Sequence, residues 1–286
     1  MSHVLVIAGL VVREAARRRL LLVLLILTLI VIALTGWGFS RIPTLSQGGR
    51  MLGDVAVKTL ASQFLILSMF MFSFVLAMAA VFVAAPSIAN EVESGVALAL
   101  LSRPLSRTEY ILGKWLGHAA LLALYAAGAG AIELLVVNAV VGYLPPEPFA
   151  FLGFLIGEGL VILTLALLIS TRLSGMVGGV IALALFGIAW IGGIAGGIGA
   201  AFDNSTIEHA GTVTRLLLPT DALWRGAVFA LEPAAVIAAS SQAGPAVAAN
   251  PFFAASALPL AIELYAAAWV AVLLGLTVLS FRTREP

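Results

Sequence analysis

The sequence predicts an all-α integral membrane protein with six transmembrane helices, an N-terminal interfacial helix and a short cytoplasmic helix between spans two and three. Apolar residues make up 62% of the 286 residues and charged residues only 10%, whereas soluble domains have about 45–50% and about 25%. The mean hydropathy is +1.13. The apolar residues also form six continuous runs without the alternation of a membrane strand. Lipid is therefore the solvent for most of this chain.

Residues 1–19 contain the first predicted element, an interfacial helix. Glu14 precedes Arg17 and Arg18 by three and four residues, a spacing that permits ion pairs along one helix face. The alternative is that Val4–Val12 extends the first span.

Six runs have the length of about 20 residues that crossing the hydrocarbon core requires. They are Leu20–Phe39, Phe64–Ala89, Tyr110–Val141, Phe151–Thr171, Gly175–Ala201 and Ala257–Ser280. The third run is longer than lipid requires, so its first turns are expected to lie in water. The whole chain, 1–286, is interpreted as a single transmembrane domain.

The distribution of Lys and Arg predicts that both termini lie in the cytoplasm of a cell-membrane protein. In that orientation ten basic residues are inside: Arg13, Arg17, Arg18, Arg19, Arg103, Arg107, Lys114, Arg172, Arg282 and Arg284. Five are outside: Arg41, Arg50, Lys58, Arg215 and Arg225.

Residues 202–256 are predicted to form an extracytoplasmic connection. Within it Thr220 precedes Asp221 in the manner of a helix N-cap. Trp224 and Arg225 favour a short helix resting on the outer membrane face.

Residues 90–104 form the predicted cytoplasmic helix. Asn90 with Glu93 is a candidate N-terminal cap, and Pro104 after Arg103 ends the segment. The resulting helix of about 13 residues is too short to span. Ser106 with Glu109 is a second capping box, which places the start of the third helix near Arg107.

Several classes of protein are excluded by what the sequence lacks. It has 15 basic and 14 acidic residues, so it has no surplus of positive charge for nucleic acid. It has no cysteine, no P-loop and no HExxH motif. The three histidines (His3, His118 and His209) are far apart in sequence and predict no metal site. No nucleotide-binding, catalytic or cofactor motif is present, so the chain is not expected to be an enzyme.

The cytoplasmic segment resembles a loop of a known family. Glu91-x-Glu93-x-Gly95, then Leu100–Arg107, then Tyr110-x-x-Gly113-Lys114-x-x-Gly117 resembles the cytoplasmic loop of ABC-2 type permeases, the membrane subunits of one class of ATP-driven transporters. The chain length and the segment Leu218–Arg225 are similar to the nitrous-oxide-reductase maturation permease and to multidrug-type exporters.

This resemblance implies a division of labour between subunits. A separate cytoplasmic P-loop ATPase would bind ATP and Mg, and a second copy of this chain or a homologous permease would complete the transporter. The helix Asn90–Arg103, ended by Pro104, would be a coupling helix in a groove of the ATPase. Gly95 would permit close approach, and Glu91 and Glu93 would pair with basic groups of that partner.

Three acidic residues lie within spans: Glu133, Glu158 and Glu263. A charge in the bilayer costs at least about 2.5–3.5 kcal/mol, so each is expected to face protein or water. They either form one polar layer lining a translocation path or hold helices together by hydrogen bonds. The glycines four residues apart in the fifth span, such as Gly192 and Gly196, favour close packing, either between subunits or within one.

The favoured hypothesis is the permease subunit of an ATP-driven exporter. Two alternatives remain open: a stand-alone proton-coupled secondary transporter using the three intramembrane carboxylates, and a non-transporting membrane scaffold or signalling subunit. Nothing in the residues identifies a transported substrate.

Overall fold

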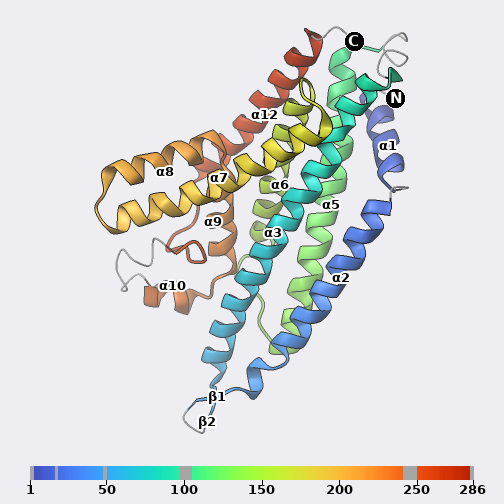
Figure 1. Cartoon of the computed structure of the whole chain (residues 1–286). Coiled ribbons are helices and arrows are strands. Elements are labelled where there is room, and N and C mark those ends of the chain that lie inside the picture. The colour runs from blue at the N-terminus through green and yellow to red at the C-terminus, as the bar shows by residue number, and fades with distance from the viewer. Residues whose placement is uncertain (1–2, 17–18, 48–49, 97–104, 241–249, 284–286) are drawn as a thin grey trace.

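The computed structural model describes residues 3–16, 19–47, 50–96, 105–240 and 250–283. Within these ranges six helices are long and apolar enough to cross a membrane, which confirms the predicted number. Figure 1 shows that α1 and the end of α12 lie at one end of the molecule, and a small β-hairpin at the other. We call these the terminal end and the hairpin end.

The chain begins with two separate helices, α1 (His3–Ala16) and α2 (Arg19–Phe39). The junction between them, residues 17–18, lies outside the described residues, so the interfacial position of the N-terminal helix stays a prediction. After α2 come one 3-10 turn, η1 (Ile42–Thr44), and the hairpin of β1 (Ser46–Gln47) and β2 (Arg50–Met51). Its register pairs Ser46 with Met51.

Two long helices, α3 (Asp54–Glu93) and α5 (Arg107–Val141), run along most of the length of the bundle (Figure 1). Their 40 and 35 residues correspond to about 60 and 52 Å, well beyond the roughly 30 Å hydrocarbon core. The predicted capping box of α5 is confirmed. The Glu109 N–H donates to Ser106 Oγ over 3.1 Å, and the Ser106 N–H donates to the Glu109 carboxylate over 2.9 Å. Gly142, with φ +66°, ends the helix in the left-handed conformation that glycine adopts without strain.

Three further spans follow: α6 (Pro148–Ser170), α7 (Gly175–Ala201) and α12 (Leu260–Arg282). Pro148 occupies the first turn of α6, where its missing N–H leaves no bond unmade. The ends of α6 and α12 meet at the terminal end, because Thr171 Oγ1 and Ser280 Oγ lie 2.7 Å apart. The two helices therefore run in the same direction.

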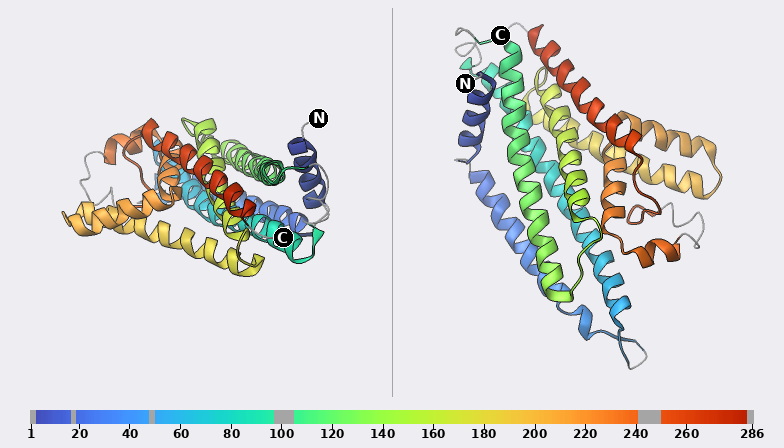
Figure 2. Two further views of the ribbon diagram at one scale, coloured as in Figure 1. Left: turned by 90° about the horizontal axis from the view of Figure 1, so that it is seen from above. Right: turned by 180° about the vertical axis from the view of Figure 1, so that it is seen from behind.

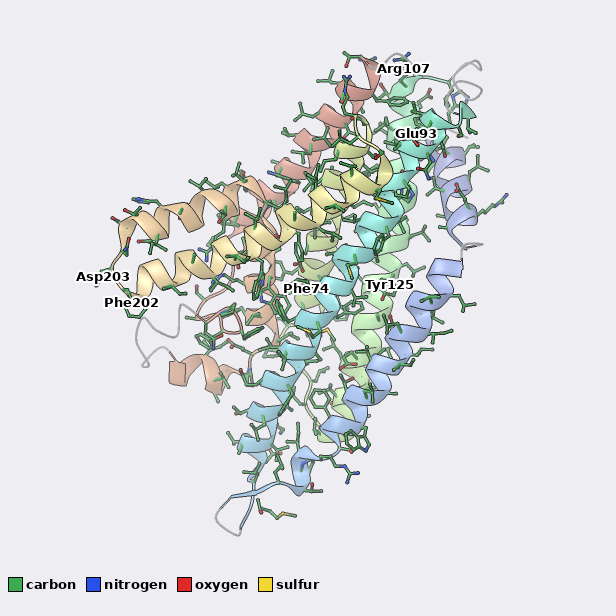
Figure 3. All side chains as sticks on the ribbon, in the orientation of Figure 1. Phe74, Glu93, Arg107, Tyr125, Phe202 and Asp203 are labelled. Atoms are coloured by element: carbon green, nitrogen blue, oxygen red, sulfur yellow. The ribbon has the colours of Figure 1, made fainter. Side chains whose placement is uncertain are left out.

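The predicted connection between the fifth and sixth spans contains α8 (Ser205–Leu217), α9 (Thr220–Leu231) and α10 (Ala234–Ser240). α8 folds back along α7, and the turn between them, at Phe202 and Asp203, projects away from the bundle (Figure 3). Seen from above, α1 and the α7–α8 pair lie at opposite edges of an elongated bundle (Figure 2).

The core between α3, α7 and α9 is aromatic. Phe70 contacts Trp190 and Trp224 with ring centroids 4.8 and 5.5 Å apart, and Phe74 meets Phe186 edge to face. The Trp224 indole N–H donates to the Pro251 carbonyl over 2.9 Å, so this buried polar group is satisfied.

The structure corrects two predictions about α9. Its N-cap is Pro219 and not Thr220, which is the first helical residue and has a buried hydroxyl without a hydrogen-bond partner among the described residues. Trp224 is also not available to a membrane surface. Trp224 is 1% exposed because α9 packs against α6 and α7.

The predicted helix start at Asn90 is wrong. Asn90 lies inside α3, which continues to Glu93, and its carbonyl accepts the Ser94 N–H over 2.9 Å. The break comes instead at Gly95, whose φ of +74° is the left-handed conformation that terminates helices. Arg103, Pro104 and the rest of 97–104 lie outside the described residues.

Candidate functional site

At the terminal end of the molecule, a largely buried ion pair joins the last turns of α3 to α5. The Lys114 ammonium and the Tyr110 hydroxyl both donate to the Glu91 carboxylate, and Lys114 also donates to the Ser87 carbonyl over 3.3 Å. The Lys114 side chain is 6% exposed and that of Glu91 21%. Glu91 thus has partners within its own chain, whereas the family resemblance implied partners on another protein.

Glu93 and Gly95, in contrast, remain outside this network. Glu93 is exposed, and an added Cβ at Gly95 would meet nothing within 4 Å. Figure 3 shows Glu93 and Arg107 at the same end of the molecule, on either side of the undescribed 97–104. We call Asn90–Val96 the hinge. Asn90, Glu91 and Lys114 line a small cavity of about 200 Å³ between α1, α3 and α5.

Two glycines of α5 form the seat of α1. A Cβ on Gly113 would lie 2.6 Å from Ile7 Cβ, and one on Gly117 would lie 2.7 Å from Val11 Cβ. His3 Nδ1 also lies 3.1 Å from the Glu109 carboxylate. The two glycines permit backbone-distance contact between the helices, so α1 and the hinge are both held by the first turns of α5.

Two of the three intramembrane carboxylates hold helices together. Glu133 Oε2 lies 3.0 Å from Thr35 Oγ1 of α2, and Ser68 of α3 lies 3.4 Å from its other oxygen. Glu158 accepts a hydrogen bond from Ser73 Oγ over 2.8 Å. Ser68 and Ser73 are five residues apart, about 140° around α3, so the two carboxylates contact different faces of that helix.

The third carboxylate, Glu263, lines a groove of about 550 Å³ between α5, α6, α9 and α12. Glu147, the N-cap residue of α6, lines the same groove. Most of the wall is apolar, including Phe154, Leu223 and Phe229. Its volume is in the range of ligand sites, about 300–1,000 Å³.

A buried charge cluster joins α7, α8 and α9. The Asp221 carboxylate, whose side chain is 0% exposed, accepts from Arg215 over 2.7 Å and from Arg225 over 3.3 Å. Arg215 also donates to the Gly193 carbonyl over 2.8 Å. Gly193 has to be glycine here, since a Cβ would overlap the Asp221 carboxylate.

The described residues contain no group of three or more His, Cys, Asp or Glu side chains placed to hold a metal ion. The candidate functional parts are the charges that join helices, the hinge, and the groove lined by Glu147 and Glu263.

The sequence profile of the ABC-2 family transporter proteins matches residues 5–285.

This chain belongs to the ABC-2 transporter family.

No curated protein matches the sequence. The ABC-2 match covers nearly the whole chain and makes it a multi-pass membrane component of a transporter. Members of the family are non-catalytic transport components, and membership implies an ATPase partner.

Two parts of this ABC-2 protein were not predicted from the sequence: the Asp221 charge cluster and the groove. The Asp221–Arg225 pair has a local signal, opposite charges four residues apart. Arg215, however, reaches Asp221 from the end of α8 across a turn, and no spacing rule predicts that contact. The groove was missed because its wall combines residues from helices far apart in sequence.

Glu232 is a buried acid of this ABC-2 protein. It follows the last residue of α9 and lies outside the six spans. Its carboxylate accepts only the Ala254 N–H, over 3.4 Å, and one of its oxygens has no partner among the described residues. Burial raises the pKa of Glu232 to about 8. The nearby Tyr143 hydroxyl donates to the Leu231 carbonyl over 2.5 Å, and burial raises the pKa of Tyr143 as well.

Glu232 makes the stability of the protein depend on pH. Because its pKa is raised in the folded state, the folded protein holds this proton at pH values where the unfolded chain has lost it. The free energy of unfolding is therefore expected to fall as pH rises from about 4.5 to about 8. Glu232→Gln removes this contribution. Thermal midpoints of wild type and variant at pH 5 and pH 9 test it, and an equal pH dependence in both would contradict the assignment.

Proposed function

We propose that this chain is the membrane-spanning subunit of an ATP-driven exporter. It would form the translocation path, while a separate P-loop ATPase would bind and hydrolyse ATP with Mg. Two copies of this chain, or this chain and a homologous permease, would pair with two ATPase subunits. The observation that carries the proposal is the family match over residues 5–285 on a chain of six spanning helices.

The excess of basic residues near the terminal end supports a cytoplasmic position for that end in the cell membrane. The hairpin end and the loop from α5 to α6 would then lie outside. In this orientation the hinge faces the compartment that contains ATP, and α3 and α5 are long enough to extend beyond the bilayer toward it.

The hinge is the proposed contact with the ATPase. Glu93 is exposed there and available to a basic partner, whereas the Glu91–Lys114 pair joins the hinge to α5. A movement imposed on the hinge would reach the third span through this ion pair and the adjoining seat of α1. Arg103 and Pro104 complete the proposed coupling segment, 90–104.

Glu93→Lys tests the contact. A charge-assisted hydrogen bond contributes about 1.5–3 kcal/mol, so its loss should weaken ATPase binding about tenfold or more. The measurement is the affinity of the purified permease for its ATPase, together with the ATPase rate of the complex.

The matched control is Glu208→Lys, the same charge reversal at an exposed position on α8. It should leave affinity and rate unchanged. Wild-type affinity and rate in Glu93→Lys would contradict the coupling role of the hinge.

A further inference from the structure

We propose that the groove between α5, α6, α9 and α12 binds an elongated amphipathic cation, with its positive group near Glu147 and Glu263 and its apolar body along α6. That this ligand is the transported cargo rests on the exporter function proposed above. The binding itself does not, because it requires only residues of this chain.

The groove has the shape of a long site. It follows α6 from Glu147 to Val161, which corresponds to about 21 Å along the helix axis. Gly153 leaves part of its floor open, because nothing lies within 4 Å of a Cβ built there, whereas Gly157 and Gly226 pack against Leu223 and Phe154. Trp115 of α5 is part of the wall, and its indole N–H is already satisfied by Thr164 Oγ1 at 2.9 Å. The wall along the helix therefore presents an apolar surface to a ligand.

Both charges of the groove lie in its half nearer the hairpin end. Glu147 occupies the N-cap position of α6, without a capping hydrogen bond from its side chain, and Glu263 lies in the first turn of α12. Since α6 and α12 run in the same direction, both carboxylates lie toward the hairpin end of the groove. Helix N-termini favour negative charge.

These two carboxylates have no basic partner in the described part of the chain. No Lys or Arg is among the described residues that line the groove, and neither carboxylate has a hydrogen-bond or ion-pair partner there. This distinguishes them from Glu91 and Asp221, which have basic partners. Two carboxylates in one half of an apolar groove complement a ligand with a positive head and a hydrophobic body.

The aromatic wall selects for the same ligand class. Phe154 and Phe229 offer ring surface to an apolar body, and aromatic faces also attract organic cations. An anionic amphiphile would meet repulsion from both carboxylates. An uncharged one would leave them without a partner.

The test uses three rod-shaped fluorescent probes that differ in charge: trimethylammonium-diphenylhexatriene, uncharged diphenylhexatriene and diphenylhexatriene propionate. Energy transfer from tryptophan to each probe is measured on the full-length chain in phosphatidylcholine nanodiscs, relative to empty nanodiscs. The cationic probe should bind saturably, and about tenfold or more tightly than the other two.

Two variants assign the binding to the groove. Glu147→Gln combined with Glu263→Gln should weaken the cationic probe about tenfold or more and leave the uncharged probe unchanged. Gly153→Leu should fill the groove and abolish saturable binding. Gly187→Leu is the matched control, because Gly187 on α7 also has nothing within 4 Å of a built Cβ but does not line the groove.

Equal affinity for the cationic and uncharged probes would assign the groove to lipid chains and overturn the proposal. Unchanged cation binding in Gly153→Leu, with the protein monodisperse, would place binding elsewhere and also overturn it. The measurement needs neither the ATPase nor ATP. Loss of coupling in Glu93→Lys with intact probe binding would therefore separate the two proposals.

Discussion

Asp221→Asn is expected to lower the free energy of unfolding by about 3 kcal/mol. Removing one partner of a buried ion pair typically costs about 3–5 kcal/mol, because the other charge stays buried without compensation. Here two arginines lose their shared carboxylate, but their side chains are 30% and 19% exposed and keep some hydration. The effect therefore lies toward the lower limit of that range.

Asp54→Asn is the matched control, since Asp54 also pairs with a basic residue four positions later, Lys58, at 2.8 Å. Both side chains of that pair are exposed, so its loss should cost about 0–1 kcal/mol. Unfolding in mixed micelles, followed by tryptophan fluorescence, compares the two variants. Equal losses of unfolding free energy in the two variants would show that burial does not strengthen the ion pairs of Asp221.

Gly196→Leu is expected to separate α8 from α7. A Cβ at position 196 would lie 2.9 Å from the Cα of Gly211, a backbone atom that cannot rotate away. Overpacking against side chains costs about 1–3 kcal/mol, and contact between two backbones should cost more because a whole helix has to move. A lower thermal midpoint and a displaced α8 are the expected results.

The displacement can be measured with a single introduced thiol, since the chain has no cysteine. Thr214→Cys places it on α8 against Gly192 of α7, and its maleimide labelling should accelerate when Gly196→Leu is added. Gly187→Leu in the same helix should leave labelling unchanged and stabilise the helix by about 0.8 kcal/mol. No acceleration in the Gly196→Leu background would contradict the close contact of the two helices.

The spans were predictable because crossing the lipid requires a minimum length and an apolar composition, and both are visible in the sequence. The range expected for the fifth span, Gly175–Ala201, is the range of α7. The start of α5 was predictable for a different reason. The Ser106–Glu109 capping box is a local motif whose two hydrogen bonds need no other part of the chain.

The hinge shows where local motifs fail. Asn90 with Glu93 has the same form as Ser106 with Glu109, yet the helix runs through Asn90. The difference is tertiary, because Lys114 and Tyr110 of α5 bind the Glu91 carboxylate and α3 stays helical to Glu93, just before Gly95. The competing signal was Gly95 itself, which commonly ends helices.

The glycines of the fifth span show a second limit. Their spacing predicted close packing, but could not tell a subunit interface from packing within one chain. The structure assigns Gly192, Gly196 and Gly199 to contacts with α8 of the same chain. Predicting these contacts from the sequence would require knowing that α8 packs on α7. The sequence of α8 gives little sign of it, because it contains only one glycine, Gly211.

The attachment of α12 has a mechanical consequence. Arg107 donates to the Arg282 carbonyl over 2.7 Å, and Arg172 donates to the Ser280 carbonyl over 3.0 Å. Of its three buried residues, Thr277 and Phe281 lie near this same end, and only Ala266 lies in the first half. The helix is thus clamped to α5 and α6 at the terminal end of the molecule. In its first half it is held to α8, because the side chains of Tyr265 and Trp269 donate to the carbonyls of Leu216 and Leu217. Ser280 and Glu263 are 17 residues apart, about 26 Å along the helix, so a tilt of 5° about the clamp would move Glu263 by roughly 2 Å and would have to carry α8 along or break its bonds to Tyr265 and Trp269.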